Sequence, residues 1–395
     1  MRISGEFCFT LDGCDFLDGF TSKTCHLSYQ KDNEDITKLQ GLSKTKCLRT
    51  LLALPLSRDS IFKSKSMDPI LCELFQGVGG YLKVLSLSES SIIELPDSIG
   101  DLKHLRYLDL SMTEVEKIPS SVCTLYNLQT LLLSACLKLT QLPTNTCNLI
   151  NLRHLVIEHT PLKEMPPQMF KLKNLQTLSD FVLGENGGSR IKELGELKSL
   201  HGSLCISGLE NVVDVDDVLQ ADLKNKECLT ELTLRWEHYN ISHDSTKEKE
   251  VLTALEPHKM LKILRINDYK GMMFPDWIAC ESFSNMVGVF LDNCKNCCLL
   301  PPLGQLPSFR NLYIKEMDGL ESIGNEFCST SLTTPFPSLE KLHIDSMGSL
   351  ERWSFTGAEQ EGEIFPHLKT LDIRSCDKLN VGLPAGCFPS LEAIS

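Results

Sequence analysis

The sequence predicts an α/β solenoid in which each repeat contributes one short parallel strand. The first observation is a recurring pattern of apolar residues, LxxLxL, whose fourth and sixth positions point to the same face of an extended segment. The second is its spacing, because the pattern starts at Leu82, Leu105, Leu128, Leu152 and Leu175, and so returns every 23 or 24 residues. This is the period of leucine-rich repeats. The third is a proline-containing segment between strands, for example IIELPDSIGDL and VEKIPSSVCTL.

A single unit cannot bury its own apolar stripe, whereas stacked units bury a continuous column of leucines. The proline after an apolar residue suits a returning turn or a short 3₁₀ helix better than a helix interior, because proline fixes φ and lacks a donor. We therefore expect a leucine-rich-repeat horseshoe. Short parallel strands form its concave face, and loops, 3₁₀ turns and short helices form its convex face.

The repeat pattern divides the chain into two segments. Residues 1–46 contain no visible repeat and are interpreted as a leader or linker, and residues 47–395 as an array of about 12–13 units. The array is regular from 82 to 178 and irregular afterwards, with spacings between 23 and 32 residues. Extra residues should bulge on the convex side, because the strands must keep their register, and the longest insertion should form a helical turn at 247–255.

The last residues, LEAIS at 391–395, fall inside a repeat. Solenoids need polar terminal caps, because an uncovered last unit exposes apolar core and unpaired strand groups. We expect an array that ends without a cap, as in a fragment or a truncated gene product.

The composition favours a cytoplasmic protein. The chain has 39 Lys and Arg against 52 Asp and Glu, a net charge of −13, which argues against nucleic acid or an anionic membrane as the main partner. The opening segment lacks the apolar core of a signal peptide, and no run approaches the ~18 apolar residues of a membrane span. The seventeen cysteines are interpreted as free thiols, since a disulfide framework is typical of short secreted chains.

The cysteines Cys294 and Cys297 have the spacing of half a zinc site. Counting from Met286, however, Cys294 is the ninth residue of its repeat, where the leucine-rich pattern takes Asn or Cys to bond neighbouring turns, and Cys136 and Cys376 hold the same place. A structural role is therefore the preferred interpretation. No metal and no cofactor are predicted.

Catalytic motifs are missing from the sequence. It contains no GxxxxGK[ST] loop, no strand followed by GxGxxG, no GxSxG and no HExxH. The acids Glu248 and Glu250 are placed in a polar loop, where solvated charge is far commoner than general acid/base work. No catalytic residue is predicted, and cysteine hydrolysis or zinc chemistry stays the class-level alternative.

The candidate site is the concave face, formed by the residues that alternate with the buried leucines. Its carboxy-terminal half is rich in aromatic and charged residues, which are typical of protein-binding hot spots. The candidate protein-binding residues are Arg235, Trp236, Arg265, Asn267, Phe290, Asp292, Tyr313, Lys315, His343, Asp345, Asp372 and Arg374.

Longer segments of the chain resemble one family. The start of the leucine-rich-repeat domain in plant nucleotide-binding disease-resistance proteins of the coiled-coil class is similar to LKVLSLSESSIIELPDSIGDLKHLRYLDLS in this chain. Three further segments follow in that family's order: LHGSLCISGLENV, the segment ending in MMFPDWI, and LPPLGQLPSFRNLYI. The resemblance extends to the leader, which is similar to the join between a winged-helix segment and the repeats. Since intact members carry a coiled coil and a nucleotide-binding domain before the repeats, we expect this chain to begin after both.

The resemblance implies an innate-immunity function in plant defense. Repeats of this family are thought to sense pathogen effectors, directly or through a guarded host protein, and to restrain the nucleotide-binding switch, so protein partners are expected. One alternative is a general cytoplasmic signalling scaffold or a ubiquitin-ligase substrate adaptor, which would share the LPxxIG units but would not predict FPDWI or LPPLGQLPS. An extracellular receptor is a second, but it should have a signal peptide and many glycosylation triplets.

Overall fold

The structure of the protein is a computed structural model that divides into two compact units, Met1–Ser199 (unit 1) and Leu200–Ser395 (unit 2). Each unit is described by itself. The structure describes residues 8–11, 24–30, 47–54, 71, 75, 81–185, 188–237, 245–328, 335–355, 364–379 and 388–394.

Unit 1 contains a parallel sheet in which each strand pairs with its successor along the chain. Residues in register on successive strands are 23 or 24 apart from Val84 onward, for example Leu108 and Leu131. The strands are β1 (Cys8–Leu11), β2 (His26–Gln30), β3 (Thr50–Leu54), β4 (Val84–Ser86), β5 (Tyr107–Asp109), β6 (Thr130–Leu132), β7 (His154–Val156) and β8 (Thr177–Leu178), and β9 (Asp180–Val182) follows.

The first two strands lie inside 1–46, which the sequence had assigned to a leader without a repeat. In β2, Leu27 and Tyr29 are buried and pair in register with Leu51 and Ala53 of β3. The repeat is therefore present in this segment. It is hard to see in the sequence because a tyrosine takes the sixth position, where the pattern calls for an aliphatic residue.

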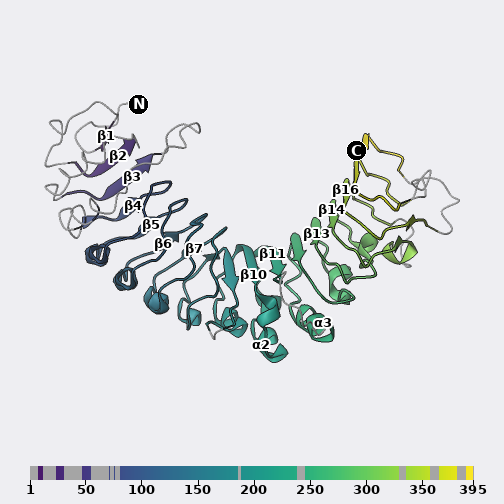
Figure 1. The fold of residues 1–395 in the computed structure, drawn as a ribbon, viewed down its shortest axis with the longest axis horizontal. Coiled ribbons are helices and arrows are strands. Elements are labelled where there is room, and N and C mark those ends of the chain that lie inside the picture. The colour runs from purple at the N-terminus through teal and green to yellow at the C-terminus, as the bar shows by residue number, and fades with distance from the viewer. Residues whose placement is uncertain are drawn as a thin grey trace. The chain divides into compact units, whose positions relative to one another are not determined.

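The 3₁₀ helices lie on the side of each repeat opposite the strands (Figure 1). The first three begin directly after Pro96, Pro119 and Pro143, as the proline-containing segments predicted. In unit 1 they are η4 (Asp97–Asp101), η5 (Ser120–Thr124), η6 (Thr144–Asn148), η7 (Met169–Lys171) and η8 (Ile191–Glu196).

The core of both units is the predicted column of apolar residues, with Leu82, Leu105, Leu108 and Leu110 fully buried. After many of the strands the eighth residue of the repeat turns into the left-handed region. In most cases its N–H donates to a carbonyl of the next repeat, as Met112 does to Ser134 at 2.7 Å. The other eighth residues with positive φ are Glu89, Ala135, His159, Asp268, Asn293, Glu316, Ser346 and Ser375.

The ninth residue bonds the preceding repeat, as the sequence predicted for cysteine. The Cys136 thiol donates to the Leu110 carbonyl at 3.1 Å, and the Cys294 thiol donates to the Ile266 carbonyl at 3.7 Å. Cys376 differs, because its thiol donates to the Arg374 carbonyl of its own repeat at 3.2 Å. Cysteine at this place therefore satisfies buried carbonyls from inside the solenoid.

Unit 2 continues the parallel architecture with longer strands and larger insertions. Its sheet contains β10 (Gly202–Ser207), β11 (Leu229–Arg235), β12 (Ile263–Asn267), β13 (Gly288–Asp292), β14 (Asn311–Lys315), β16 (Lys341–Asp345), β18 (Thr370–Arg374) and β19 (Ala393–Ile394). A second, two-stranded sheet pairs β15 (Ser322–Ile323) with β17 (Arg352–Trp353).

The insertions of unit 2 form helices. The longest insertion contains α3 (Ser245–Ala254), close to the helical turn expected at 247–255. The other helices are η9 (Leu209–Asn211), α2 (Val215–Gln220), η10 (Leu223–Asn225), η11 (Asp276–Ala279), η12 (Leu303–Gln305) and η13 (Asn325–Phe327).

Phenylalanine replaces leucine in the core behind the last strands. Phe336 stacks on Phe365 with centroids 5.0 Å apart, and Phe365 stacks on Phe388 at 5.3 Å. Trp353 packs edge-on against Phe365 at 6.5 Å. The phenylalanines of three FP segments, Phe274, Phe336 and Phe365, are thus core residues, and the partly exposed Phe388 stacks on the last of them. This explains why aromatic plus proline replaces leucine plus proline in this half.

Candidate functional site

The side chains that alternate with the core residues on the strands of unit 2 form two well-populated rows across the sheet. Side chains in register on neighbouring parallel strands lie next to each other, so each row is continuous from β11 to β18. The middle row consists of Thr233, Arg265, Phe290, Tyr313, His343 and Asp372, and the outer row of Arg235, Asn267, Asp292, Lys315, Asp345 and Arg374. We call these two rows the strand face of unit 2.

The first part of the middle row joins an ion pair to aromatic rings. The Arg265 guanidinium donates to the Glu231 carboxylate at 2.9 Å and lies 4.9 Å from the ring centroid of Phe290. The Phe290 and Tyr313 rings follow, with centroids 6.2 Å apart. A guanidinium over an aromatic face gains a cation–π attraction of about 0.5–1 kcal/mol at exposed sites, so these contacts hold the side chains in place.

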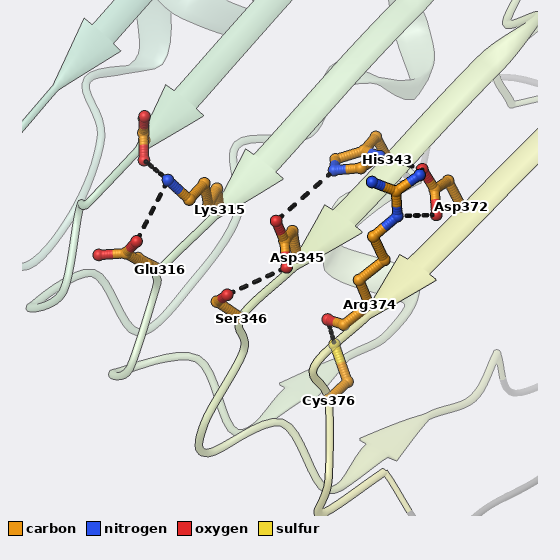
Figure 2. A network of polar contacts seen from close by, with 9 residues as sticks. Lys315, Glu316, His343, Asp345, Ser346, Asp372, Arg374 and Cys376 are labelled. Atoms are coloured by element: carbon orange, nitrogen blue, oxygen red, sulfur yellow. Dashed lines mark hydrogen bonds and ion pairs between the residues drawn. The ribbon is translucent and has the colours of Figure 1, made fainter. Parts of the chain in front are cut away.

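The second part of the middle row ends at a buried carboxylate. The Tyr313 and His343 rings are stacked 4.4 Å apart, and His343 Nδ1 lies 2.8 Å from Asp372 Oδ2. Arg374 Nε donates to Asp372 Oδ1 at 2.9 Å, and its Nη2 lies 2.8 Å from Oδ2 (Figure 2). The Asp372 side chain is only 13% exposed, so two cationic or polar partners hold a charge that would otherwise be costly to bury.

The outer row carries alternating charges around Lys315. The ammonium of Lys315 lies 3.8 Å from the Asp292 carboxylate and 3.2 Å from that of Glu316, and Figure 2 shows its contact with Glu316. The hydrogen bond to Glu316 and the charge of Asp292 raise the pKa of Lys315 above its usual value. Burial raises the pKa of Asp292, against the opposing effect of Lys315.

The neighbouring acid of that row, Asp345, accepts a hydrogen bond from the Ser346 hydroxyl at 3.0 Å and lies 3.9 Å from His343 Nε2. His343 therefore stands between two carboxylates on adjacent strands, Asp372 and Asp345. The two rows are joined at this point into one polar network (Figure 2).

Eleven of the twelve sequence-predicted site residues lie on the strand face, and the prediction for Trp236 is wrong. Its side chain is only 1% exposed, its ring packs edge-on against Tyr269 at 5.1 Å, and its indole N–H donates to the Glu248 carboxylate. Trp236 follows β11, where the chain leaves the exposed alternation and turns inward. Glu248 likewise differs from the solvated loop acid that the sequence suggested, because it is a buried residue of α3.

A third row at the start of the strands was missed in unit 2. Glu231, which pairs with Arg265, belongs to it, as do Asn311 and Lys341. The signal was present in the sequence, since these are third positions of LxxLxL, two residues before the middle row.

The thiols of Cys294 and Cys297 are poorly suited to metal binding or nucleophilic attack. Cys297 donates to the Gly271 carbonyl at 3.2 Å, as Cys294 does to Ile266. Burial raises the pKa of Cys294 to about 12 and moves the pKa of Cys297 well above its usual range. Because the thiolate is the nucleophile and the metal ligand, both residues are structural in this arrangement. Within the described ranges, no group of three or more His, Cys, Asp or Glu side chains is placed to hold a metal ion.

Comparison with known proteins identifies the family. The family described as R13L1/DRL21 LRRs matches residues 191–317, and the family described as a leucine-rich repeat region matches 33–139. Putative disease resistance RPP13-like protein 1 of Arabidopsis thaliana is 42% identical over 99% of this chain and 38% of its own length. The chain corresponds to the leucine-rich-repeat region of plant disease-resistance proteins. Disease resistance protein RGA2 of Solanum bulbocastanum is 43% identical over 79% of the chain and 32% of its own length.

The predicted resemblance to plant disease-resistance repeats is thus confirmed, as is the α/β leucine-rich-repeat solenoid. The chain spans about a third of the length of these curated relatives. Among solved structures, a leucine-rich-repeat protein of Leptospira interrogans is 21% identical, with a TM-score of 0.46 over 86% of this chain and 87% of that chain. No helix in the described part of the chain has the length and apolarity needed to cross a membrane.

Proposed function

We propose that this disease-resistance repeat region is a cytoplasmic protein-binding module of a plant immune receptor. It senses pathogen effectors, directly or through a host protein, and restrains a nucleotide-binding switch. Family membership supports the defense function, and the strand face of unit 2 supplies a surface for a protein partner. The module is non-catalytic in this proposal, which is supported by the structural contacts of Cys294, Cys297 and Glu248.

The observation that carries the proposal is the continuous middle row from Arg265 to Asp372. Its aromatic and arginine side chains are of the types that dominate binding hot spots. Ring stacking and ion pairs already fix their conformations, so a partner would lose little side-chain entropy on binding. A solvated sheet face without a partner has no need of such order.

The test is co-immunoprecipitation of the full chain from pathogen-infected leaf tissue. The wild type is compared with Tyr313→Ala and with Glu281→Ala, a control that removes an exposed carboxylate outside the strands. We expect an effector or a host protein that the wild type and Glu281→Ala both recover and that Tyr313→Ala loses by about tenfold or more, as for truncation of a hot-spot residue. An identical set of recovered proteins for all three would contradict a site on the strand face.

The restraint of the switch is tested separately. The chain is co-expressed in leaves with the part of RPP13-like protein 1 that lies outside the matched region, and cell death is scored. We expect this chain to suppress the cell death caused by that part. If cell death is not suppressed, restraint of the switch is removed from the proposal. Recovery of ubiquitin-ligase subunits in place of an effector or a host target would instead favour the adaptor alternative.

A further inference from the structure

The residues directly before the strands of unit 1 form a row of their own. They are connected by backbone hydrogen bonds, since Arg106 N–H donates to the Lys83 carbonyl and Gln129 N–H to the Arg106 carbonyl, both at 2.8 Å. Arg153 N–H donates in turn to Gln129 at 2.8 Å, and Gln176 N–H to Arg153 at 2.7 Å. We call this row, with Tyr81 and Leu82 before Lys83 and the three residues before each of the other four positions, the strand-start edge.

The strand-start edge of unit 1 is basic and carries no acid. The four-residue stretches that end in Arg106, Gln129, Arg153 and Gln176 read KHLR, YNLQ, INLR and KNLQ, in a chain with a net charge of −13. Lys83, Arg106 and Arg153 form no ion pair with any residue that the structure describes. Because like charges on neighbouring strands are destabilising, Lys83 and Arg106 side by side oppose folding unless another group neutralises them.

The same positions before the last strands of unit 2 alternate in charge, and three of them form ion pairs within the chain. The residues before β14, β16, β18 and β19 are Arg310, Glu340, Lys369 and Glu392, so the charge alternates from strand to strand. Glu340 lies 3.9 Å from Arg310 and 3.4 Å from Lys369. At the strand-start edge of unit 1, Lys173 pairs with Glu196 at 3.3 Å, whereas Lys83, Arg106 and Arg153 have no ion pair with any described residue, so a negative partner would complete this edge.

Apolar side chains stand between the cations of this edge. Tyr126 and Ile150 are 57% and 52% exposed, and they lie on successive repeats. Their backbone is held by asparagines, since Asn151 Nδ2 donates to the Tyr126 carbonyl at 2.7 Å and Asn174 Nδ2 to the Ile150 carbonyl at 2.9 Å. Two large apolar groups are therefore displayed on a rigid backbone, which is the arrangement of anchors in a binding surface.

We propose that the strand-start edge of unit 1 binds an acidic protein segment that also carries apolar side chains. The carboxylates would pair with Lys83, Arg106 and Arg153, and the apolar side chains would cover Tyr126 and Ile150. Neighbouring strands are about 4.8 Å apart, so the edge from β4 to β8 is about 19 Å long, the reach of about six extended residues. This site is separate from the strand face of unit 2 and does not depend on the function proposed for it.

A protein segment fits this edge better than nucleic acid. Nucleic acid requires a dense track of cations, whereas the row here alternates Arg106 and Arg153 with the neutral Gln129 and Gln176. Nucleic acid would also leave the exposed Ile150 side chain uncovered.

The experiment is fluorescence anisotropy on the full chain with a labelled peptide of about ten residues, mostly Asp and Glu with leucines among them, and with labelled single-stranded RNA. The test variant is Arg106→Gln/Arg153→Gln, which places at both positions the residue that the row already uses at 129 and 176 and so preserves the fold. The matched control is Lys117→Gln/Lys163→Gln, which removes the same charge from exposed residues of unit 1 outside the edge. A third variant, Tyr126→Ala/Ile150→Ala, tests the apolar contribution.

We expect the peptide to bind the wild type with a micromolar Kd that weakens as salt screens the charges. The Arg106→Gln/Arg153→Gln variant should bind about tenfold more weakly and the control within about twofold, since close charge pairs carry most of such binding. The Tyr126→Ala/Ile150→Ala variant should bind the peptide about fivefold more weakly, and its binding of RNA should not change. The proposal is overturned by no peptide binding at about 1 mM, by equal loss in the control, or by RNA binding more tightly than the peptide.

Discussion

The ring of Tyr313 lies parallel to the ring of His343, with 4.4 Å between centroids and 4° between planes. These residues are directly in register on β14 and β16, so the stack follows from the spacing of neighbouring strands. It connects the aromatic part of the middle row to Asp372. The strand face of unit 2 is therefore a coupled set of side chains, and a change at one residue should affect its neighbours.

Replacing His343 by alanine should lower the free energy of unfolding by about 1–2 kcal/mol, because the change removes the ring stack and one partner of the poorly exposed Asp372 carboxylate. Urea denaturation measures the change. Arg235→Ala is the matched control, because Arg235 is an exposed residue of the same face without an ion pair to any described residue, and its effect should stay within about 0.5 kcal/mol. Equal losses in both variants would refute the coupling of the middle row.

Replacing the fully buried Leu108 by aspartate should unfold or insolubilise the chain. The change places an unpaired carboxylate in the leucine column, at a cost of several kcal/mol. Expression in the soluble fraction and circular dichroism measure the outcome. Asp109→Leu, at the next position on the exposed face of β5, is the control and should stay folded, and a soluble, folded Leu108→Asp protein would contradict the assignment of the two faces.

The period of LxxLxL was sufficient to predict one strand in each repeat from Val84 onward, because a slip of one residue would bring the leucines out of the core. It gave no signal for the short strands β9, β15 and β17. It was insufficient at the first strands, where Tyr29 occupies an aliphatic position and the pattern becomes unreadable. The core accepts this substitution, since the largely apolar ring of Tyr29 is buried there, but a search for leucine in the sequence does not detect it.

The candidate site was predictable wherever the alternation of β-strands continues. The prediction was wrong for Trp236, because β11 ends at Arg235 and the residue after it no longer follows the alternation of inward and outward side chains. The partner that holds this indole inside, Glu248, comes from an insertion with no repeat pattern. Contacts of this kind depend on the three-dimensional path of the insertion, which a periodic pattern cannot specify.

The thiols should react with iodoacetamide according to burial. Cys298 and Cys280 are exposed, whereas burial raises the pKa of Cys294 to about 12 and that of Cys297 above its usual range. At pH 8 we expect the exposed pair to be alkylated first and the buried pair only after addition of denaturant, as measured by peptide mass spectrometry. Rapid alkylation of Cys294 in the native protein would show a reactive thiol and reopen the catalytic alternative.

Metal analysis provides an independent check on Cys294 and Cys297. Both thiols donate to backbone carbonyls of the preceding repeat, so a zinc ion would have to displace these bonds and two protons. Purified protein should contain less than about one tenth of an equivalent of zinc, on the expectation of one metal for a real site. A stoichiometric content that falls in Cys294→Ser would be the opposite result.

Replacing Asp292 by asparagine should make the stability less dependent on pH. Burial raises the pKa of this acid in the folded protein, so the folded state binds the proton more tightly than the unfolded state does. Its ionised form therefore costs stability as pH rises through the raised pKa, and protonation relieves that cost at lower pH.

Asp292→Asn should accordingly be slightly more stable than the wild type at pH 7, by less than about 1 kcal/mol because the group is partly exposed. This gain in stability should disappear towards pH 3. Thermal denaturation at both pH values measures it, with Asp318→Asn, an exposed acid in a neighbouring turn, as the control. A variant less stable than the wild type at pH 7 would mean that the attraction of Lys315 outweighs the desolvation of Asp292.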